Sequence, residues 1–428
     1  MNTEKLINEL FDFIKSSPTA FHATETVAKE LRSNGYTELF ECEAWSLAEG
    51  GKYFVRRGGT SVIAFRYSGK PNPFMICASH GDTPTFRVKG SEKDGKAYGK
   101  LLVERYGGPI LYSWFDRPLS VAGRVMVRTE GGIEARLVNI DRDMAVIPSL
   151  AIHLNPSVNE KFSPSLATDT FPLLSGADGV SIEDIIANEC GARREMLISH
   201  DLFLYNRDAG KRYGNSGEFI LVPRLDDLAC AFTSMKAFID AKDNETIPVL
   251  AVFDNEEVGS ETKQGAASTF LSDILERIIP DKGEYLRSLA ASYMVSADNA
   301  HAKHPNHPEL SDAANAPTLS GGVVIKYNAN QKYATDGLSA ALFKIICERA
   351  GVKVQLFYNR PDLPGGSTLG SISNTKVSVP TVDIGIPQLA MHSATETAAA
   401  EDIGAMYLAL CEMYSVCLDI KNDEIIIK

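Results

Sequence analysis

The chain carries, at residues 247–260, the sequence IPVLAVFDNEEVGS. Its first seven residues form an apolar run, which is typical of a buried strand in a parallel sheet. Two adjacent carboxylates, Glu256 and Glu257, follow the end of that run. Ligands of open α/β sheets bind just beyond the carboxyl ends of such strands. One glutamate could therefore hold a metal ion while the other moves a proton, although a charged loop is the simpler interpretation of this stretch alone.

Side chains of metal-ligand type recur at the ends of other predicted elements. His80 and Asp298 each follow an apolar run, and His392 comes shortly after a β-rich run. An Asp-Asp pair at 226–227 opens a segment with apolar residues at helical spacing. Imidazole and carboxylate groups are ordinary zinc ligands. Two His, two Asp and one Glu would suit a pair of Zn²⁺ ions that share one carboxylate.

The composition is that of a soluble globular protein, with 44% hydrophobic and 23% charged residues. A chain of 428 residues exceeds what one core usually holds, so we expect two domains. The net charge of -12 argues against nucleic acid or an anionic membrane as a partner. The sequence has no apolar run long enough for a membrane span, no visible secretory signal and no Cys-x-x-Cys pair, so we expect a cytoplasmic protein with reduced thiols.

The pattern of polar and apolar residues changes between about residues 90 and 222. Short runs there alternate polar and apolar residues and are interrupted by glycine and proline, which predicts an antiparallel β-rich module. The flanking sequence alternates β and α segments, as in a parallel sheet. We therefore predict an α/β fold with two domains, a catalytic one of residues 1–90 and 223–428 and an inserted β-rich one of residues 91–222. His80 precedes the insertion and the other candidate ligands follow it, so the last part of the chain must fold back onto the first.

Six segments, taken together, resemble the ordered motifs of aspartyl aminopeptidases, which are di-zinc exopeptidases. In chain order they are SPTAFHA (17–23), SHGDTP (79–84), RLDDL (224–228), DNEEVGS (254–260), SADNAH (296–301) and MHS (391–393). The resemblance covers nearly the whole chain. It implies a zinc-exopeptidase-like mixed sheet flanked by helices, with the inserted domain serving oligomerisation.

The resemblance also implies a role for each candidate ligand. Asp226 corresponds to the carboxylate that bridges two zinc ions. His80 and Asp298 complete the site of one ion, and Glu257 and His392 complete the site of the other. Co²⁺ or Mn²⁺ are possible substitutes for the two Zn²⁺ of each subunit.

Two further roles follow from the resemblance alone. Glu256 corresponds to the general base, and Asp82 to a carboxylate that orients the imidazole of His80. The residues themselves do not say which member of the pairs 226–227 and 256–257 plays which part. One departure from the family pattern is the glycine at position 81, where the family usually has threonine. We expect it to loosen the end of the strand without disturbing the ligand.

Four residues are candidates for substrate binding. Lys326 and Tyr333 lie in a segment that resembles the family's side-chain pocket, where a buried lysine could pair with an acidic substrate side chain. A solvated lysine on an edge strand is the alternative interpretation. Gly366 and Ser367 belong to a turn that resembles a family loop whose backbone approaches the substrate, although a plain turn would look the same.

His153 lies on an apolar run in the predicted insertion. A single histidine in such a run is most often a hydrogen-bonded core residue. In the resembling family, a histidine of the inserted domain reaches into the neighbouring subunit's site and helps to stabilise the tetrahedral intermediate. By that resemblance, the functional unit is a homo-oligomer based on dimers, with a tetrahedral assembly of twelve subunits as the larger possibility.

The leading hypothesis is a metalloaminopeptidase that removes N-terminal residues, acidic ones first, from peptides with a free N-terminus. A broader, basic or neutral preference on the same site is the nearest alternative. A carboxypeptidase or deacylase would need a cation for the substrate's terminal carboxylate, for which Arg360 is the candidate. An inactive self-assembling scaffold of the same fold is the alternative from a different class, and the intact set of ligands with Glu256 argues against it.

Overall fold

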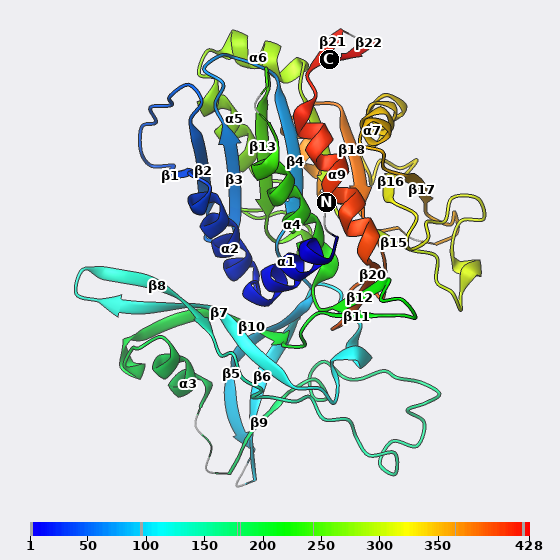
Figure 1. Ribbon diagram of the computed structural model, residues 1–428. Coiled ribbons are helices and arrows are strands. Elements are labelled where there is room, and N and C mark those ends of the chain that lie inside the picture. The colour runs from blue at the N-terminus through cyan, green and yellow to red at the C-terminus, as the bar shows by residue number, and fades with distance from the viewer. Residues whose placement is uncertain are drawn as a thin grey trace.

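The computed structural model describes residues 3–94, 97–177, 179, 181–242, 244–363, 365–421 and 424–428. These residues form an α/β lobe around a large sheet and a β-rich lobe beside it (Figure 1). Among them, no helix combines the length and the apolar character that crossing a lipid bilayer requires.

The α/β lobe is built on a nine-stranded mixed sheet of order β1-β2-β3-β13-β4-β14-β18-β16-β17. In chain order its strands are β1 (Thr37–Leu39), β2 (Lys52–Arg57), β3 (Ser61–Arg66), β4 (Phe74–His80), β13 (Ile247–Phe253), β14 (Tyr293–Ala297), β16 (Val323–Tyr327), β17 (Val354–Tyr358) and β18 (Thr381–Gly385). The central strands β13, β4, β14 and β18 are parallel, and β13 and β4 are buried along their whole length. Burial on both faces explains why these strands are continuous apolar runs in the sequence.

Helices cover both faces of this sheet (Figure 1). One face packs against α1 (Thr3–Ser16), α2 (Ala20–Ser33), α4 (Leu225–Asp240), α7 (Gly337–Arg349) and α9 (Ala400–Ser415). The other face packs against α5 (Phe270–Ile278), α6 (Lys282–Ala290) and α8 (Leu369–Asn374). Successive residues of β4 alternate between the two cores, with Met75 and Cys77 in the first and Phe74 and Ile76 in the second.

The β-rich lobe is a six-stranded antiparallel sheet of order β8-β7-β10-β5-β6-β9. Its strands are β5 (Thr85–Asp94), β6 (Tyr98–Tyr106), β7 (Leu119–Thr129), β8 (Gly132–Asn139), β9 (Leu173–Gly176) and β10 (Leu197–Asn206). Helix α3 (Ile182–Glu189) packs on one face of this sheet and contributes Ile182 and Ile186 to a separate core. The β-rich strands therefore form a sheet with a core of its own.

A third sheet of five strands joins the end of the insertion to the α/β lobe. It consists of β11 (Lys211–Tyr213), β12 (Phe219–Val222), β15 (Ala300–His301), β19 (Pro387–Leu389) and β20 (Glu396–Ala399). The six-stranded sheet thus begins at Thr85 and ends at Asn206, whereas β11 and β12 pair outside it. The division at 91–222 stays a prediction, and the strand pairing favours boundaries near 84 and 207. A C-terminal hairpin, β21 (Leu418–Lys421) and β22 (Glu424–Ile427), packs on the first core.

Arg124 of β7 docks the β-rich lobe on the α/β lobe. Its guanidinium donates to the carbonyl of Gly58 at 2.8 Å, in the turn between β2 and β3. It also donates to the Asp201 carboxylate at 2.9 Å and lies 4.4 Å from the centre of the Phe21 ring in α2. A single half-buried side chain therefore bridges three segments through charge-assisted and cation–π contacts.

We expect Arg124→Ala to destabilise the protein by about 2 kcal/mol, the cost of losing a charge-assisted hydrogen bond together with a cation–π contact. Differential scanning fluorimetry would measure the loss, and hydrogen exchange should accelerate at residues 57–61 and in β7. Arg136→Ala is the control, because Arg136 pairs with Glu134 within the β-rich lobe. Equal effects of the two substitutions would contradict the docking role of Arg124.

Candidate active site

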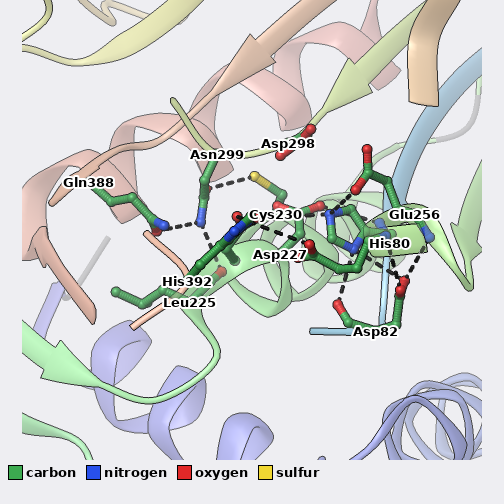
Figure 2. Close-up of polar contacts among 12 residues, drawn as sticks. His80, Asp82, Leu225, Asp227, Cys230, Glu256, Asp298, Asn299, Gln388 and His392 are labelled. Carbon is green, nitrogen blue, oxygen red and sulfur yellow. Dashed lines mark hydrogen bonds and ion pairs between the residues drawn. The ribbon is translucent and has the colours of Figure 1, made fainter. Parts of the chain in front are cut away.

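The candidate ligands gather at the carboxyl ends of the central parallel strands (Figure 2). His80 ends β4 and is aligned with Phe253, which ends β13. Strand β14 lies on the other side of β4, and Asp298 follows its last residue. Because these strands are parallel and in register, the residues that follow them meet at one edge of the sheet.

Two overlapping groups of side chains place metal-ligand atoms within 4.8 Å of one another. The first group consists of His80, Asp226 and Asp298. The second consists of Asp226, Glu257 and His392. Asp226, at the start of α4, belongs to both groups, which is the division that the resemblance implied.

The donor set fits divalent cations. The Nε2 atom of His80 lies 3.7 Å from Asp226 Oδ1, and the Nε2 atom of His392 lies 3.4 Å from Asp226 Oδ2 and 3.5 Å from Glu257 Oε2. Asp226 Oδ1 and Glu257 Oε1 are buried and have no hydrogen-bond partner. Buried carboxylate oxygens without a partner are costly unless a cation binds them, and nitrogen with oxygen donors suits zinc.

The protonation of this cluster reflects crowding by acids. Burial, reinforced by the charge of Asp226, raises the pKa of Glu257 well above its usual value. Burial also raises the pKa of Glu256 to about 8. Although burial alone would lower it, the contact with Asp226 raises the pKa of His392 to about 8. The cluster therefore carries more acid than its histidines neutralise, and a cation would relieve the repulsion.

The structure separates the two members of the Asp pair. Asp226 joins both ligand groups, whereas Asp227 accepts the backbone N–H of His80 at 3.2 Å through its Oδ2 atom. Asp227 is fully buried and supports the end of β4. The geometry thus favours Asp226 over Asp227 as the candidate ligand, a choice that sequence patterns alone left open.

The Glu pair is separated in the same way. Glu257 has a side chain only 4% exposed and lies beside His392, whereas Glu256 is 15% exposed with its Oε2 atom 4.0 Å from His80 Nε2. A third set of close donor atoms contains His80 with both glutamates. Both glutamates of the 3-10 turn η3 (Glu256–Val258) line the adjoining cavity, and Glu256 is the more exposed of the two.

Asp82 lies behind the ligands and holds the Glu pair. Its carboxylate accepts the backbone N–H groups of Glu256 at 3.1 Å and Glu257 at 3.2 Å. The Nδ1 atom of His80 lies 3.1 Å from the Asp82 carbonyl oxygen and 3.4 Å from its Oδ1 atom. The residue after His80, Gly81, donates its N–H to the carbonyl of Phe253 at 2.8 Å, which ties this strand end to β13.

Glu396 is a further residue of the candidate site, and no sequence pattern pointed to it. It is 1% exposed, and its carboxylate accepts the backbone N–H groups of Asp226 at 3.0 Å and His392 at 2.7 Å. Burial raises its pKa to about 8. It therefore fixes two ligand-bearing loops at once, and no strand-end pattern marks it because it begins β20 in the third sheet.

A cavity of about 140 Å³ adjoins the ligand groups. Lys326, Tyr333, Gly366 and Ser367, the four residues proposed from sequence, all line it together with Glu256. The wall also includes two residues that the sequence analysis did not assign to the pocket, His301 and Phe357, whose rings lie 6.2 Å apart. The position of His301, three residues after Asp298, was the available signal.

Lys326 is buried and pairs with the chain itself. Strand β16 lies between β18 and β17, and Lys326 is only 2% exposed, so the interpretation as a solvated edge lysine is wrong. Its ammonium donates to the carbonyls of Asp298 at 2.7 Å and Asn299 at 3.2 Å and lies 3.6 Å from Asp298 Oδ2. Although burial opposes it, the charge of Asp298 helps to raise the pKa of Lys326, so the lysine stays positive at the cavity wall.

His153 lies apart from this cavity. It is exposed, in a long loop that precedes β9, so the interpretation as a core histidine is wrong. It is absent from the lining of the cavity beside the ligands. Apolar side chains around it are also exposed, namely Leu150, Ile152, Leu154 and Phe162.

Comparison with known proteins agrees with this geometry. The family described as "Aminopeptidase I zinc metalloprotease (M18)" matches residues 13–414. A "Probable M18 family aminopeptidase 2" of Clostridium acetobutylicum is 44% identical over 417 residues, covering 94% of this chain and 96% of that protein. Its counterpart in Pseudomonas savastanoi pv. phaseolicola is 38% identical over 423 residues, covering 96% and 98%.

Solved structures show the same fold. The cryo-EM structure of the Ape4 and Nbr1 complex has a TM-score of 0.93 at 35% identity, covering 96% of this chain and 86% of that chain. The S. cerevisiae mApe1 dodecamer has a TM-score of 0.84 at 27% identity, covering 97% of both chains. The fold and the family match define a metalloprotease of the aminopeptidase class. The chain belongs to the M18 family of zinc aminopeptidases, so the predicted family and fold class are confirmed.

We expect Zn²⁺ to raise the melting temperature of chelator-treated protein, because a cation offsets repulsion among buried carboxylates. At a free ion concentration 1,000 times the dissociation constant, the gain is about 4 kcal/mol. Glu257→Gln should raise the melting temperature of the metal-free protein, since the unfolded chain ionises this carboxyl whereas burial beside Asp226 keeps it protonated in the folded site, and should reduce the Zn²⁺ increment. Differential scanning fluorimetry measures both, with Glu348→Gln on the exposed face of α7 as control. An undiminished increment in Glu257→Gln would rule out its place in the site.

Proposed function

We propose that this aminopeptidase uses two zinc ions per subunit to remove N-terminal residues, preferentially Asp and Glu, from peptides. The observation that carries the proposal is the pair of ligand groups sharing Asp226, with Glu256 beside them at a cavity wall. Membership of the M18 family supports the peptidase chemistry. A cytoplasmic location, and the exclusion of nucleic acid and membrane partners, stay predictions from the sequence.

Each of the two ligand groups would bind one ion. His80 and Asp298 would hold one ion, Glu257 and His392 the other, and Asp226 both. Zinc bound in such a pair polarises the scissile carbonyl and supplies a water of lowered pKa. Co²⁺ or Mn²⁺ would suit the same nitrogen and oxygen donors.

Glu256 acts as the general base in this proposal. Its carboxylate lines the cavity beside the ligand groups, where it would accept a proton from the attacking water and return it to the leaving amine. The raised pKa of its free carboxyl reflects burial among acids, and a nearby cation would lower it again. Asp82 fixes the turn that carries this glutamate.

Lys326 supplies the preference for acidic residues. Its ammonium is committed to backbone carbonyls, so it would attract a substrate carboxylate through its charge, at the wall shared with Tyr333. Gly366 and Ser367 line the same cavity and leave their backbone open to the substrate. A broader or basic preference is the alternative, and the charge of Lys326 disfavours basic residues.

Two other functions fit less well. A carboxypeptidase or deacylase would need a cation for the substrate's terminal carboxylate, but Arg360 pairs with Asp362 at 2.7 Å and does not line the cavity beside the ligands. An inactive scaffold would have no physical need for a buried acid such as Glu256 beside the ligand groups.

The subunits are proposed to share their sites. The similarity to the mApe1 dodecamer supports a homo-oligomer based on dimers, with a tetrahedral dodecamer as the larger form. The exposed apolar side chains around His153 suit burial against a second copy. There His153 would enter the neighbouring site and stabilise the tetrahedral intermediate.

Glu256→Gln should reduce kcat by about 10²–10⁴-fold, because it removes the proton acceptor while keeping the side chain's size. The assay uses a panel of peptide substrates with N-terminal Asp, Glu, Leu, Lys or Ala. Each substrate is measured with chelator-treated protein and again after Zn²⁺, Co²⁺ or Mn²⁺ has been restored. Hydrolysis by the variant at the wild-type rate would refute the mechanism. A wild-type protein that cleaves none of these substrates would favour another di-metal hydrolase or the scaffold.

Lys326→Met should lower the ratio of Asp to Leu hydrolysis by about tenfold or more, since it removes roughly 1.4 kcal/mol or more of charge attraction. The ratio of kcat/KM values is the readout, because the contact with Asp298 makes the absolute rate fall for every substrate. Lys332→Met, which removes an exposed ammonium bound to the Gly365 carbonyl, is the control. An unchanged ratio would remove Lys326 from substrate selection.

Mixing of His153→Ala with Glu256→Gln tests the shared site. Each variant alone should be nearly inactive, but random reassociation places one complete site in half of the dimers, which restores about a quarter of wild-type activity. Full activity of His153→Ala on its own, or of a stable monomer, would contradict the shared site.

A further inference from the structure

The connection that leaves the β-rich lobe after β6 runs along the ligand groups. We call residues 106–110, of sequence YGGPI, the strap. It links the end of β6 to the 3-10 turn η1 (Leu111–Trp114). The strap belongs to the inserted unit, yet it contacts residues of the α/β lobe on both sides of the candidate metal site.

Tyr106 forms the first contact. Its hydroxyl donates to Asp82 Oδ2 at 2.7 Å and accepts a hydrogen bond from Asn255 Nδ2 at 2.9 Å. Its ring packs edge-on against Phe203 of β10, with the ring centres 5.5 Å apart. The six-stranded sheet therefore fixes the ring, and the ring presents one hydroxyl to the α/β lobe.

The hydroxyl of Tyr106 is hydrogen-bonded to the Asp82 carboxylate, which also contacts candidate ligands. Asp82 Oδ2 accepts both this hydroxyl and the N–H of Glu257, while Oδ1 accepts the N–H of Glu256 and lies 3.4 Å from His80 Nδ1. Without the Tyr106 hydroxyl, Oδ2 keeps only the N–H of Glu257, so the carboxylate is held less firmly. A rotation would displace the backbone of both glutamates and change the environment of the histidine together.

The other end of the strap holds His392. The carbonyl of Gly108 lies 3.2 Å from His392 Nδ1 and accepts its hydrogen, which leaves Nε2 directed at Asp226 and Glu257. The N–H of Ile110 donates to the His392 carbonyl at 2.9 Å. A ring nitrogen fixed by a carbonyl keeps the opposite nitrogen available as a ligand.

Between these contacts the strap passes directly over Glu257. Gly107 has a φ of +69°, and a Cβ at this position would lie 3.1 Å from the Cβ of Glu257 and 3.3 Å from its carbonyl oxygen. Only glycine fits both the left-handed backbone and this close approach.

We propose that the strap is a positioning element for both ligand groups of its own subunit, with Tyr106 as its principal positioning residue. The inserted unit would then contribute to the metal site within one chain, apart from any contact between subunits. This inference rests on the proposed function insofar as the two groups bind divalent cations.

The test measures Zn²⁺ affinity of chelator-treated protein by competition with a chromogenic chelator. Tyr106→Phe removes one hydroxyl and keeps the ring, and we expect affinity to fall about 10–100-fold, the usual effect of losing a partner behind a metal ligand. The Co²⁺ absorption spectrum should shift, and kcat should fall more than KM rises. Tyr293→Phe is the matched control, because that buried hydroxyl donates to the Ser339 carbonyl at 2.7 Å, at the opposite end of β14.

Gly107→Ala provides an independent variant. The added methyl group must displace Glu257 or the strap, so we expect weaker Zn²⁺ binding and an altered Co²⁺ spectrum. Gly132→Ala at the start of β8, where φ is also positive but the space is open, should change neither. Wild-type affinity in folded Tyr106→Phe and Gly107→Ala would overturn the inference and leave the proposed function intact. Failure of the wild-type protein itself to bind Zn²⁺ would overturn both.

Discussion

Acids crowd around Asp226, and several distant parts of the fold act to hold them there. Glu256, Glu257 and Asp298 surround that carboxylate in a largely buried region, with two histidines and Lys326 to offset them. Such a cluster is unfavourable in isolation, because each ionised carboxylate loses its hydration and repels its neighbours. The fold must therefore hold the acids in place until a cation offsets their negative charge. Much of the surrounding hydrogen bonding serves to hold them.

The support comes from elements distant in sequence. Glu396 in the third sheet fixes the backbone at Asp226 and His392, and Asp82 fixes the turn of the Glu pair. Lys326 ties the loop after β14 to β16. Each of these supports is a buried polar group that is hydrogen-bonded to backbone atoms. The candidate ligands are therefore held rigidly in place before any ion binds. A site built this way loses little entropy on binding, and that favours tight metal affinity.

Much of the fold and the clustering of the candidate ligands could be predicted from the sequence because both follow from local patterns. Parallel strands buried on both faces give apolar runs, and a polar residue after such a run falls at one edge of the sheet, which is why His80, Glu257 and Asp298 were candidates. The assignment within the pairs 226–227 and 256–257 needed the resemblance, since adjacent residues differ only in the direction that a non-helical turn gives them. The extent of the β-rich unit was harder to predict, because β12 pairs with β20, more than 170 positions later in the chain.

The same dependence on contacts between distant parts of the chain explains why no sequence pattern pointed to Glu396 or Tyr106. Neither follows a strand that ends at the site, and each acts through a backbone or carboxylate partner that only the folded chain brings near. Tyr106 is informative because it comes from the inserted unit, whose composition suggests an independent β-rich module. An insertion that merely joined subunits would have no physical reason to place a hydroxyl on Asp82 and a carbonyl on the ring of His392. Through these two contacts the insertion helps to hold the candidate metal site, so a change in how the β-rich lobe docks should displace the candidate ligands.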